Sequence, residues 1–224
     1  MTRELKRQGV GVGRRRVARL IREHGIATVT RRKRRNLTRP DARAARVPDL
    51  IRRQLSAPIP GLTPVGDISS FATAEGWVYL ATVLDLCSKG LIGHAIAPHM
   101  RAGLVVDAIT AAHRAKLVAG NAIMHTNRGS QYHSKAYCHA LQRLEIRQST
   151  SRTGSCRDGA AAESFFATIT AEIGAEAWPD RASARRDIEN RTTYYNQRRL
   201  HFALGYETPT RTRRAWQDRI SMAS

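Results

Sequence analysis

The sequence predicts an α/β domain built on a mixed β-sheet, with basic segments before and after it. Three β-rich runs follow one another from Val65, separated by the short turns AEG and SKG. Helical and strand patterns then alternate along residues 101–150. The 224-residue chain is 42% hydrophobic, which suffices for one globular domain with a small appendage and excludes a disordered tail.

Each element of this domain is predicted from its own pattern. VGDISSF, GWVYLATVLDL and LIGHAIA indicate an antiparallel three-stranded meander, and a first hairpin centred on Ala74 would place residue 67 opposite residue 81. Residues 101–117 are expected to form a helix, NAIMHT a short strand, residues 134–144 a helix and EIRQST another strand. Three strands followed by alternating helix and strand indicate a mixed sheet with flanking helices.

Two helices are predicted after the sheet. Ser155 and Asp158 fit a capping box at the start of the first, whose buried ridge would be Phe165, Ile169 and Ile173. Residues 181–196 are expected to form the last helix, followed by a turn-rich segment that ends near Pro209.

Positive charge is concentrated at the two ends of the chain. The formal net charge is +20: residues 1–46 contribute +13, residues 181–224 contribute +6, and residues 60–180 hold ten charges of each sign. Basic extensions around a neutral body are typical of proteins that bind a polyanion and keep their catalytic acids apart from it. Nucleic acid is therefore the expected partner.

The N-terminal extension begins with a basic helix that fits two interpretations. Val17, Leu20 and Ile21 form an apolar stripe, Gly25 follows where a helix would stop, and arginines crowd the same segment at Arg14, Arg15, Arg16, Arg19 and Arg22. The segment fits the second half of a helix-turn-helix and equally a solvated basic helix. Arg31, Arg32 and Lys33 then open a cationic linker expected to lie on phosphates.

Membrane and disulfide chemistry are not indicated. No apolar run approaches the roughly 18 to 20 residues of a membrane-spanning helix, and the start TRELKRQG lacks an apolar secretory core, so a soluble, cytoplasmic chain is expected. Three widely spaced cysteines, Cys87, Cys138 and Cys156, fit free thiols better than a disulfide framework or a zinc site.

Three polar residues occupy special points of the predicted fold: Asp67 in the first strand, Asn127 after the fourth, and Glu163 on the capped helix, with 35 residues between Asn127 and Glu163. With the surrounding motifs VGDIS, HTNRGSQY, GSCRDGAAAESFFAT and YYNQRRLHFALGYETP, the chain resembles the DDE transposases of bacterial insertion sequences. Their core is like that of retroviral integrases. The resemblance, which runs from about Gly61 to Arg211, is to the copy-out, paste-in group and to its second-reading-frame product.

The resemblance implies a ribonuclease-H-like five-stranded fold and a division of the chain. It assigns residues 1–28 to a partial helix-turn-helix, 29–60 to a basic linker, 61–180 to an integrase-type catalytic core, and 181–224 to a C-terminal basic helix and tail. It further implies double-stranded DNA as partner, both element ends and target, together with self-association and a possible fusion to or pairing with an upstream-frame product.

The resemblance also implies a site for two Mg²⁺ or Mn²⁺ ions, with residues 67, 127 and 163 as catalytic metal ligands. Two such ions stabilise the attacking and leaving oxygens of a displacement at phosphorus. The second acid of the family is replaced by Asn127, which lowers the formal charge of the site from −3 to −2. Asp85 is about four residues too far along its strand to substitute, and Asp158 is expected to cap a helix.

Further departures from the family pattern suggest a truncated or degenerate copy. Thr170 stands where a DNA-contacting Lys is usual, and the chain is expected to begin partway through the helix-turn-helix. Other unusual residues are Pro64, Ser70, Gly159 and Phe202.

The remaining candidates each have a structural alternative. His125 is expected to be a hydrogen-bonded strand-end histidine rather than a metal ligand; Arg128 and Gln131 would either touch DNA or cap the next helix. Tyr194 and Tyr195 are expected to pack their helix on the core, and Arg198 and Arg199 to contact DNA, within a signature that includes Asn196 and His201. Trp77 and Phe165 are expected in the core.

The function predicted is therefore DNA transposition by a polynucleotidyl transferase that is weak or inactive as written. The alternative is a non-catalytic DNA-binding remnant that occupies element ends or inhibits active transposase. A ribonuclease-H-like nuclease is a third interpretation, which the signatures outside the acids disfavour.

Overall fold

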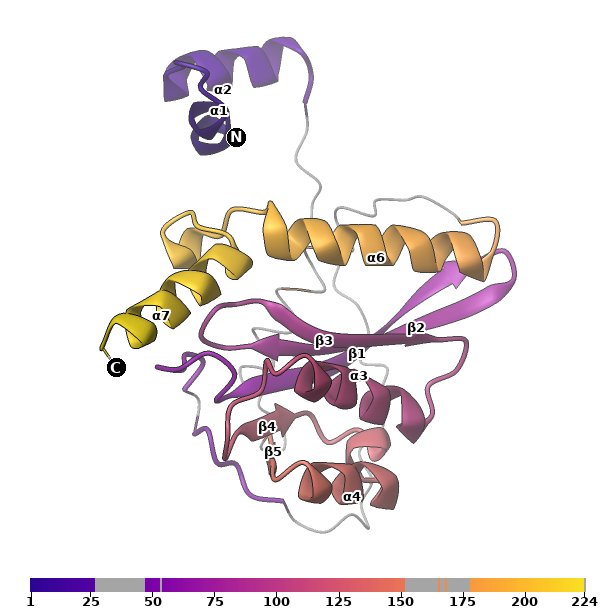
Figure 1. Ribbon diagram of the computed structural model, residues 1–224. Coiled ribbons are helices and arrows are strands. Elements are labelled where there is room, and N and C mark those ends of the chain that lie inside the picture. Colours follow the sequence, from indigo (N-terminus) through magenta and orange to yellow (C-terminus); the bar gives the residue numbers. More distant parts are fainter. Residues whose placement is uncertain (27–46, 53, 152–164, 166–167, 169–177, 224) are drawn as a thin grey trace.

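A five-stranded mixed sheet forms the centre of the protein, in a computed structural model that describes residues 1–26, 47–52, 54–151, 165, 168 and 178–223 (Figure 1). The strands are β1 (Pro64–Thr73), β2 (Gly76–Asp85), β3 (Leu91–Ala97), β4 (Ile123–Thr126) and β5 (Arg147–Thr150). Their order is β3-β2-β1-β4-β5; the first three strands are antiparallel, and β4 and β5 run parallel to β1. The predicted mixed sheet and its meander are confirmed.

The register of the first hairpin differs by one residue from the prediction. Asp67 lies opposite Thr82 rather than Ala81, because the turn contains two residues, Ala74 and Glu75. Gly76, with φ of +110°, takes the left-handed conformation that closes this tight turn. Directly opposed residues share a face of a sheet, so the correction decides which side chains neighbour Asp67.

Helices cover both faces of the sheet (Figure 1). On one face α3 (Ala102–Arg114) and α4 (Lys135–Arg143) pack against Ile68, Val83 and Met124. On the other face α6 (Arg181–Gln197) contributes Ala184, Ile188 and Tyr195 to a cluster with Val65, Phe71 and Phe165. Removal of this apolar surface from water supplies the main favourable free energy of the fold.

Side-chain alternation places Asp67 on the α6 face. Val65 and Phe71 belong to the α6-side cluster, whereas Ile68 belongs to the α3-side cluster, as the period of two in a strand requires. Phe165, which is 1% exposed, lies in the cluster of Val65 and Phe71. Phe165 therefore packs on the same face of the sheet that carries Asp67.

Two glycines permit close approach around this centre. A Cβ on Gly66 would overlap the Met124 side chain, and one on Gly93 would overlap the Ala108 carbonyl of α3. Only glycine therefore fits beside β4 at position 66 and beneath α3 at position 93 without a shift of the neighbours.

The N-terminal extension forms two helices, α1 (Thr2–Arg7) and α2 (Arg14–Glu23). Both end on a left-handed glycine, Gly9 and Gly25, as the sequence predicted for the second. Of the predicted apolar stripe, Val17 is buried, Ile21 is half-buried and Leu20 is exposed.

The C-terminal segment differs in part from the prediction. The predicted turn-rich segment up to Pro209 is confirmed and contains the short 3₁₀ turn η2 (Phe202–Leu204). After it a further helix, α7 (Pro209–Ala223), follows where only a tail was expected. A second 3₁₀ turn, η1 (Ser130–His133), connects β4 to α4. Within the described residues no helix is long and apolar enough to cross a membrane.

Candidate functional site

Two of the three predicted ligand residues meet at the junction of β1 and β4. The parallel register pairs Val65 with His125 and Gly66 with Thr126, so Asp67 and Asn127 come next to each other. The Asn127 Nδ2 donates a hydrogen bond of 2.9 Å to Asp67 Oδ1. These residues are 60 positions apart in sequence, and the strand pairing alone brings them together.

The amide of Asn127 is oriented by two hydrogen bonds. Its oxygen accepts from the Gly129 backbone N–H at 2.8 Å, while its nitrogen faces Asp67. Asp67 Oδ1 also accepts from the Ile68 backbone N–H at 2.9 Å. Reversal of the amide would place an oxygen against the carboxylate and a nitrogen against an N–H, so this network fixes the observed orientation.

Tyr132, which was not predicted as part of the site, belongs to the cluster on the α3 side of the sheet, with its hydroxyl close to Gly66. It is fully buried, and burial, together with the nearby charge of Asp67, raises the pKa of its hydroxyl well above the usual value of 10. The hydroxyl therefore stays neutral in the physiological range. Its place in the HTNRGSQY motif was the only sequence signal that could have identified it.

His125 is held between two serines. Its Nδ1 lies 2.8 Å from Ser149 Oγ and its Nε2 lies 3.2 Å from Ser151 Oγ, and the imidazole is 2% exposed. The predicted hydrogen-bonded strand-end histidine is confirmed. The two serines and the imidazole together link β4 to β5. Neither Ser149 nor Ser151 was singled out in the sequence.

The loop after Asn127 is fixed by contacts other than those expected. Arg128 donates to the Ser151 carbonyl at 2.9 Å and Gln131 to the Met100 carbonyl at 3.1 Å. The cap of α4 is Ser134, whose hydroxyl accepts from the Tyr137 N–H. The interpretation of Arg128 and Gln131 as helix caps was therefore wrong, because Ser134 already fills that role.

Family comparisons place this geometry in a known group. The HTH-like domain family matches residues 1–34, and two Integrase core domain families match residues 57–156 and 144–209. Transposase InsF for insertion sequence IS3A of Escherichia coli (strain K12) is 35% identical over 214 residues, which cover 93% of this chain and 73% of that protein. The transposase for insertion sequence element IS904 of Lactococcus lactis is 32% identical and covers 93% of this chain and 83% of its own. This chain belongs to the insertion-sequence transposases.

Solved structures confirm the ribonuclease-H-like fold of this transposase. The simian T-cell lymphotropic virus intasome, solved in complex with a PP2A regulatory subunit, contains a chain that matches with a TM-score of 0.60 and 14% identity. The match covers 79% of the transposase and 60% of the intasome chain. The HTLV-2 integrase catalytic core domain in complex with magnesium matches with a TM-score of 0.56 and 13% identity, over 70% of this chain and 99% of the integrase core. At such low identities the likeness concerns the fold alone.

The third predicted ligand, Glu163, lies outside the described residues, as do Ser155, Asp158, Ile169, Thr170 and Ile173. Within the part of the chain that the structure describes, no three His, Cys, Asp or Glu side chains group to hold a metal. Phe165, two residues beyond Glu163, is helical and buried on the Asp67 side of the sheet.

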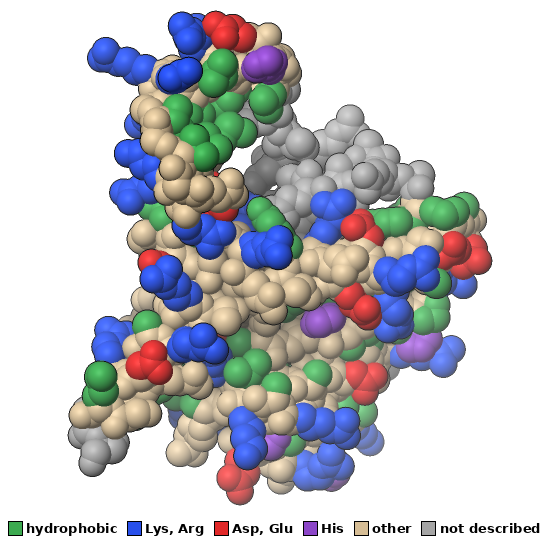
Figure 2. All heavy atoms as spheres, turned by 45° about the horizontal axis from the view of Figure 1, so that its top comes forward, with side chains coloured by type: hydrophobic (Ala, Val, Ile, Leu, Met, Phe, Trp, Pro, Cys, Tyr) green, Lys and Arg blue, Asp and Glu red, His purple; other side chains and the backbone are tan. Residues whose placement is uncertain are grey.

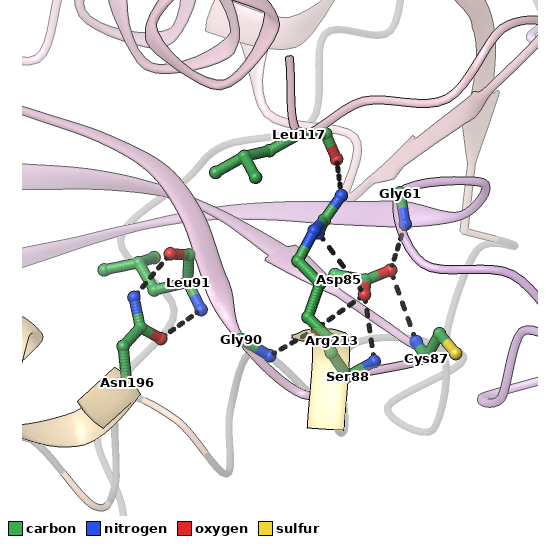
Figure 3. Close-up of polar contacts among 9 residues, drawn as sticks. All are labelled: Gly61, Asp85, Cys87, Ser88, Gly90, Leu91, Leu117, Asn196 and Arg213. Carbon is green, nitrogen blue, oxygen red and sulfur yellow. Dashed lines mark hydrogen bonds and ion pairs between the residues drawn. The ribbon is translucent and has the colours of Figure 1, made fainter. Parts of the chain in front are cut away.

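Asp85 is committed to another role, in agreement with its rejection as a stand-in ligand. Figure 3 shows its carboxylate accepting from the backbone N–H groups of Gly61, Cys87 and Ser88, with the Arg213 guanidinium of α7 at 4.0 Å. Asp85 pairs with Pro64 in the sheet, three residues from Asp67 along β1. Asp85 therefore organises the end of β2 and does not face the site.

The C-terminal signature of the transposase divides into packing and exposed residues. Tyr195 is buried and donates to the Lys89 carbonyl, and Asn196 bonds both backbone groups of Leu91 (Figure 3). Tyr194, in contrast, is 48% exposed, so the prediction that it packs on the core was wrong. α6 turns only one of two consecutive tyrosines inward, because neighbouring positions lie about 100° apart on a helix.

Two other residues test the predicted core. Phe165 is buried, as expected, and contacts Tyr195 edge-on at 4.8 Å between ring centroids. Trp77 is 53% exposed, so the expectation that it lies in the core was wrong. It opposes the exposed Ala72 next to the tip of the β1–β2 hairpin.

The predicted DNA-contacting cations that the structure describes are mostly on the surface. Arg14, Arg15, Arg16 and Arg19 are exposed on α2, and Arg198 is exposed at the end of α6. Arg128 is exposed although its Nε donates to the Ser151 carbonyl, and Arg199 is half-buried. Arg31, Arg32 and Lys33 lie outside the described residues. Figure 2 shows Lys and Arg side chains over the N-terminal helices and the part of the molecule next to them. Cys87 and Cys138 are free thiols, as predicted, and Cys156 lies outside the described residues.

Proposed function

We propose that this transposase binds double-stranded DNA, at element ends and at the target, and transfers strands at a site weakened by Asn127. Three features support DNA as the ligand: the transposase relatives, the match to the HTH-like family, and the formal charge of +20 gathered outside the neutral core. The observation that carries the proposal is the 2.9 Å contact between Asp67 and Asn127. Copies of the chain are proposed to assemble on paired ends, with or without an upstream-frame product.

The donor set fits divalent cations in part. Asp67 offers a carboxylate and Asn127 an amide oxygen, and Mg²⁺ or Mn²⁺ accepts both kinds of oxygen. With Glu163 they would form the metal-binding and catalytic set that the family places in this fold. Bound cations would supply charge stabilisation at the phosphorus undergoing displacement. The protein would contribute the fixed positions of the ligands on β1 and β4.

Asn127 weakens this set in two ways. An amide in place of a carboxylate removes one negative charge, which at ~4 Å from a divalent ion is worth roughly 8 kcal/mol at an effective dielectric of ~20 before relaxation. The amide oxygen is also engaged by the Gly129 N–H, and its NH₂ group occupies Asp67 Oδ1. A cation that used either oxygen would have to displace these hydrogen bonds, so weak occupancy is expected.

The decisive experiment compares the natural chain with Asn127→Asp in Mn²⁺-dependent strand transfer on oligonucleotides that carry the element ends. The variant is expected to transfer strands at least tenfold faster than the natural chain, and Asp67→Asn is expected to abolish the gain. Asn121→Asp is the matched control, because it adds the same charge at an exposed turn. Equal turnover of the natural chain and the variant would show that the missing carboxylate does not limit the reaction.

A second readout of the same variants does not depend on activity. In EDTA, Asn127→Asp is expected to melt at a lower temperature than the natural chain, because it places two carboxylates in contact without a cation. Addition of Mn²⁺ is expected to raise its melting temperature and to leave the Asn121→Asp control close to the natural chain. An Asn127→Asp variant that does not respond to Mn²⁺ would contradict the assignment of residues 67 and 127 as ligands.

The second candidate function is a non-catalytic DNA-binding protein that occupies element ends or inhibits active transposase. The satisfied Asp67–Asn127–Gly129 network favours it, because the pair is stable without a cation. It predicts that DNA binding is equal in the natural chain and in Asn127→Asp, and that the natural chain lowers strand transfer when mixed with the active variant. Mixtures in which the two activities simply average would exclude inhibition.

A further inference from the structure

A pocket of about 610 Å³ lies between the N-terminal helices and the C-terminal end of α6. One wall comes from α1 and the first residue of α2, and the other from α6, the segment that follows it and Tyr206. Segments nearly 200 residues apart in the sequence therefore meet here, at some distance from the Asp67 site on β1. Asp67 and Asn127 are not among the residues that line it.

The lining of the pocket is strongly cationic. Five of the residues around it are basic: Arg3, Lys6, Arg14, Arg198 and Arg199. The single acid in the lining, Glu4, is already paired with Arg7 at 2.8 Å and accepts from Gln8. Positive charge on two facing walls attracts an anionic ligand.

Exposed aromatic rings accompany this charge. Tyr194 and Tyr206 line the pocket at 48% and 38% exposure, and Phe202, 82% exposed, contacts Tyr206 edge-on at 5.7 Å between centroids. The Arg3 guanidinium lies 5.0 Å from the centroid of the Tyr206 ring. Proteins that bind unpaired nucleotides combine cations, which contact the phosphates, with aromatic side chains, on which the bases stack.

The loop that carries Phe202 and Tyr206 is held in an unfavourable conformation. Tyr206 has φ of +70°, which is rare for a bulky residue, and follows Gly205 at +65°. The loop is closed by hydrogen bonds from Tyr206 N and Leu204 N to His201 O and from His201 N to Glu207 O. Strain of this kind is found where surrounding contacts enforce a geometry, often at binding sites. Here it leaves the Phe202 ring exposed to solvent and the Tyr206 ring in the wall of the pocket.

We propose that this pocket binds unpaired nucleotides of a DNA strand, with phosphates on its Arg and Lys side chains and a base stacked on Phe202 or the tyrosines. The proposal rests on the proposed function in taking DNA as the ligand, and adds a site for single-stranded segments that a duplex cannot fill. In a duplex the base faces are covered by their neighbours, so the exposed rings favour an unpaired strand over double-stranded DNA.

The test measures binding of the full chain to three fluorescent probes: a 15-nucleotide oligothymidine, a 15-unit abasic strand with the same phosphates, and a 20-base-pair duplex. The natural chain is expected to bind oligothymidine roughly tenfold more tightly than the abasic strand. Phe202→Leu is expected to reduce this ratio at least threefold, and Phe202→Leu with Tyr206→Leu to bring it close to one. The matched control is Trp77→Leu, an exposed ring at the β1–β2 hairpin, which should leave the ratio unchanged.

The charge of the pocket is tested separately. Arg3→Gln with Lys6→Gln is expected to weaken binding of both single strands severalfold, and more than Arg143→Gln with Arg147→Gln near the opposite end of the molecule (Figure 1). A base-to-abasic ratio that Phe202→Leu leaves unchanged, or that Trp77→Leu lowers equally, would overturn the proposal. If the natural chain did not bind the duplex, the proposed function would be contradicted and the pocket proposal would not, because duplex binding does not depend on base stacking in the pocket.

Phe202 is exposed, so Phe202→Leu is expected to fold normally and the ratio stays interpretable. Melting curves of every variant provide the check. A double variant that melts early is set aside in favour of the single variant, whose ratio alone decides between stacking and charge attraction. An acidic peptide that binds as tightly as oligothymidine would likewise overturn the assignment, since it offers charge without bases.

Discussion

A single nitrogen atom distinguishes Asn127 from the aspartate that the family pattern places at this position, and that nitrogen donates to Asp67 at 2.9 Å. Two carboxylates at this distance would repel each other unless a cation or a proton lay between them. The amide of Asn127 removes that repulsion, because its NH₂ group donates to Asp67 and its oxygen accepts from the Gly129 N–H. The substitution is therefore expected to stabilise the metal-free protein while it lowers the affinity of the site for metal, a trade between stability and activity.

His201 offers a test of packing around the signature that follows α6. Its ring meets Tyr195 edge-on at 4.7 Å, and burial, reinforced by the charges of Arg199 and Lys89, lowers the pKa of the imidazole to about 4. The unfolded chain takes up the proton near pH 6.5, so the native state binds fewer protons between pH 6.5 and 4. The contribution of His201 to stability is complete above pH 6.5 and is expected to be lost as the pH falls toward 4.

His201→Phe retains the ring and removes the titration. Its melting temperature is expected to fall less between pH 7 and pH 4.5 than that of the natural chain, measured in parallel thermal unfolding curves. His99→Phe, at an exposed position, is the control and should follow the natural chain. Identical pH profiles for His201→Phe and the natural chain would mean that His201 does not couple protonation to folding.

Burial follows from the sequence where the local period sets it, as in the predicted strand VGDISSF. Ile68 and Phe71 are buried on opposite faces as alternation requires. Trp77 and Tyr194 were assigned to the core because aromatic residues are usually buried, yet Trp77 lies next to the tip of the β1–β2 hairpin and Tyr194 lies on a face of α6 turned away from the core. Residue type alone does not show which face of an element is covered.

At the scale of elements, α7 is attached to the sheet domain by a buried charge. Arg213 donates to the Leu117 carbonyl at 2.7 Å and lies 4.0 Å from the fully buried Asp85 (Figure 3). Burial lowers the pKa of the Arg213 guanidinium, and the charge of Asp85 opposes that effect. Arginines in a sequence are normally taken to lie on a solvated surface, so the residues of α7 were predicted to be a tail rather than a packed helix.

Asp85 and Arg213 are expected to contribute unequally to stability. Asp85→Asn leaves Arg213 as an uncompensated buried charge and weakens four hydrogen bonds, from Gly61, Cys87 and the Ser88 N–H and hydroxyl, so a loss of about 3 to 5 kcal/mol in unfolding free energy is expected. Arg213→Met leaves those hydrogen bonds in place and is expected to cost about 1 to 2 kcal/mol.

Urea unfolding measures both losses. Arg211→Met, which removes an exposed cation from the same helix, is the control and is expected to change stability by less than about 0.5 kcal/mol. If Arg213→Met proved as costly as Asp85→Asn, the hydrogen bonds to Asp85 would contribute little, and the ion pair would account for the attachment of α7.

The sheet itself was predictable at this scale, but its register was not. The three strands of the meander, α3 and α4 follow from the spacing of apolar residues and turn signals. The one-residue error between β1 and β2 arose because a two-residue turn and a three-residue turn fit the same letters, and Gly76 decides between them only through its backbone angle. The approach of Asp67 and Asn127 depends on the parallel pairing of β1 with β4, which no local pattern specifies.

At the scale of the whole molecule, the boundaries between basic and neutral parts of the sequence coincide with the boundaries between the extensions and the sheet domain. The sheet domain is electrically neutral between residues 60 and 180, whereas the N-terminal 46 residues carry a net charge of +13. Affinity for a polyphosphate can thus arise from the extensions without placing cations against Asp67. This separation would let DNA binding survive the loss of an acidic ligand, as the proposed function requires.

The salt dependence of duplex binding tests this division. Each phosphate neutralised by a Lys or Arg contributes about −0.9 to the slope of log affinity against log salt concentration. Arg31→Gln, Arg32→Gln and Lys33→Gln together are expected to make the slope shallower by about 2 to 3, measured by fluorescence anisotropy between 50 and 300 mM salt. The same number of neutralised cations in the core, Lys135→Gln, Arg143→Gln and Arg147→Gln, is expected to change the slope by less than about 1. A flat salt response of the natural chain, or equal changes in the two triple variants, would show that the basic extensions are not where the transposase contacts phosphate.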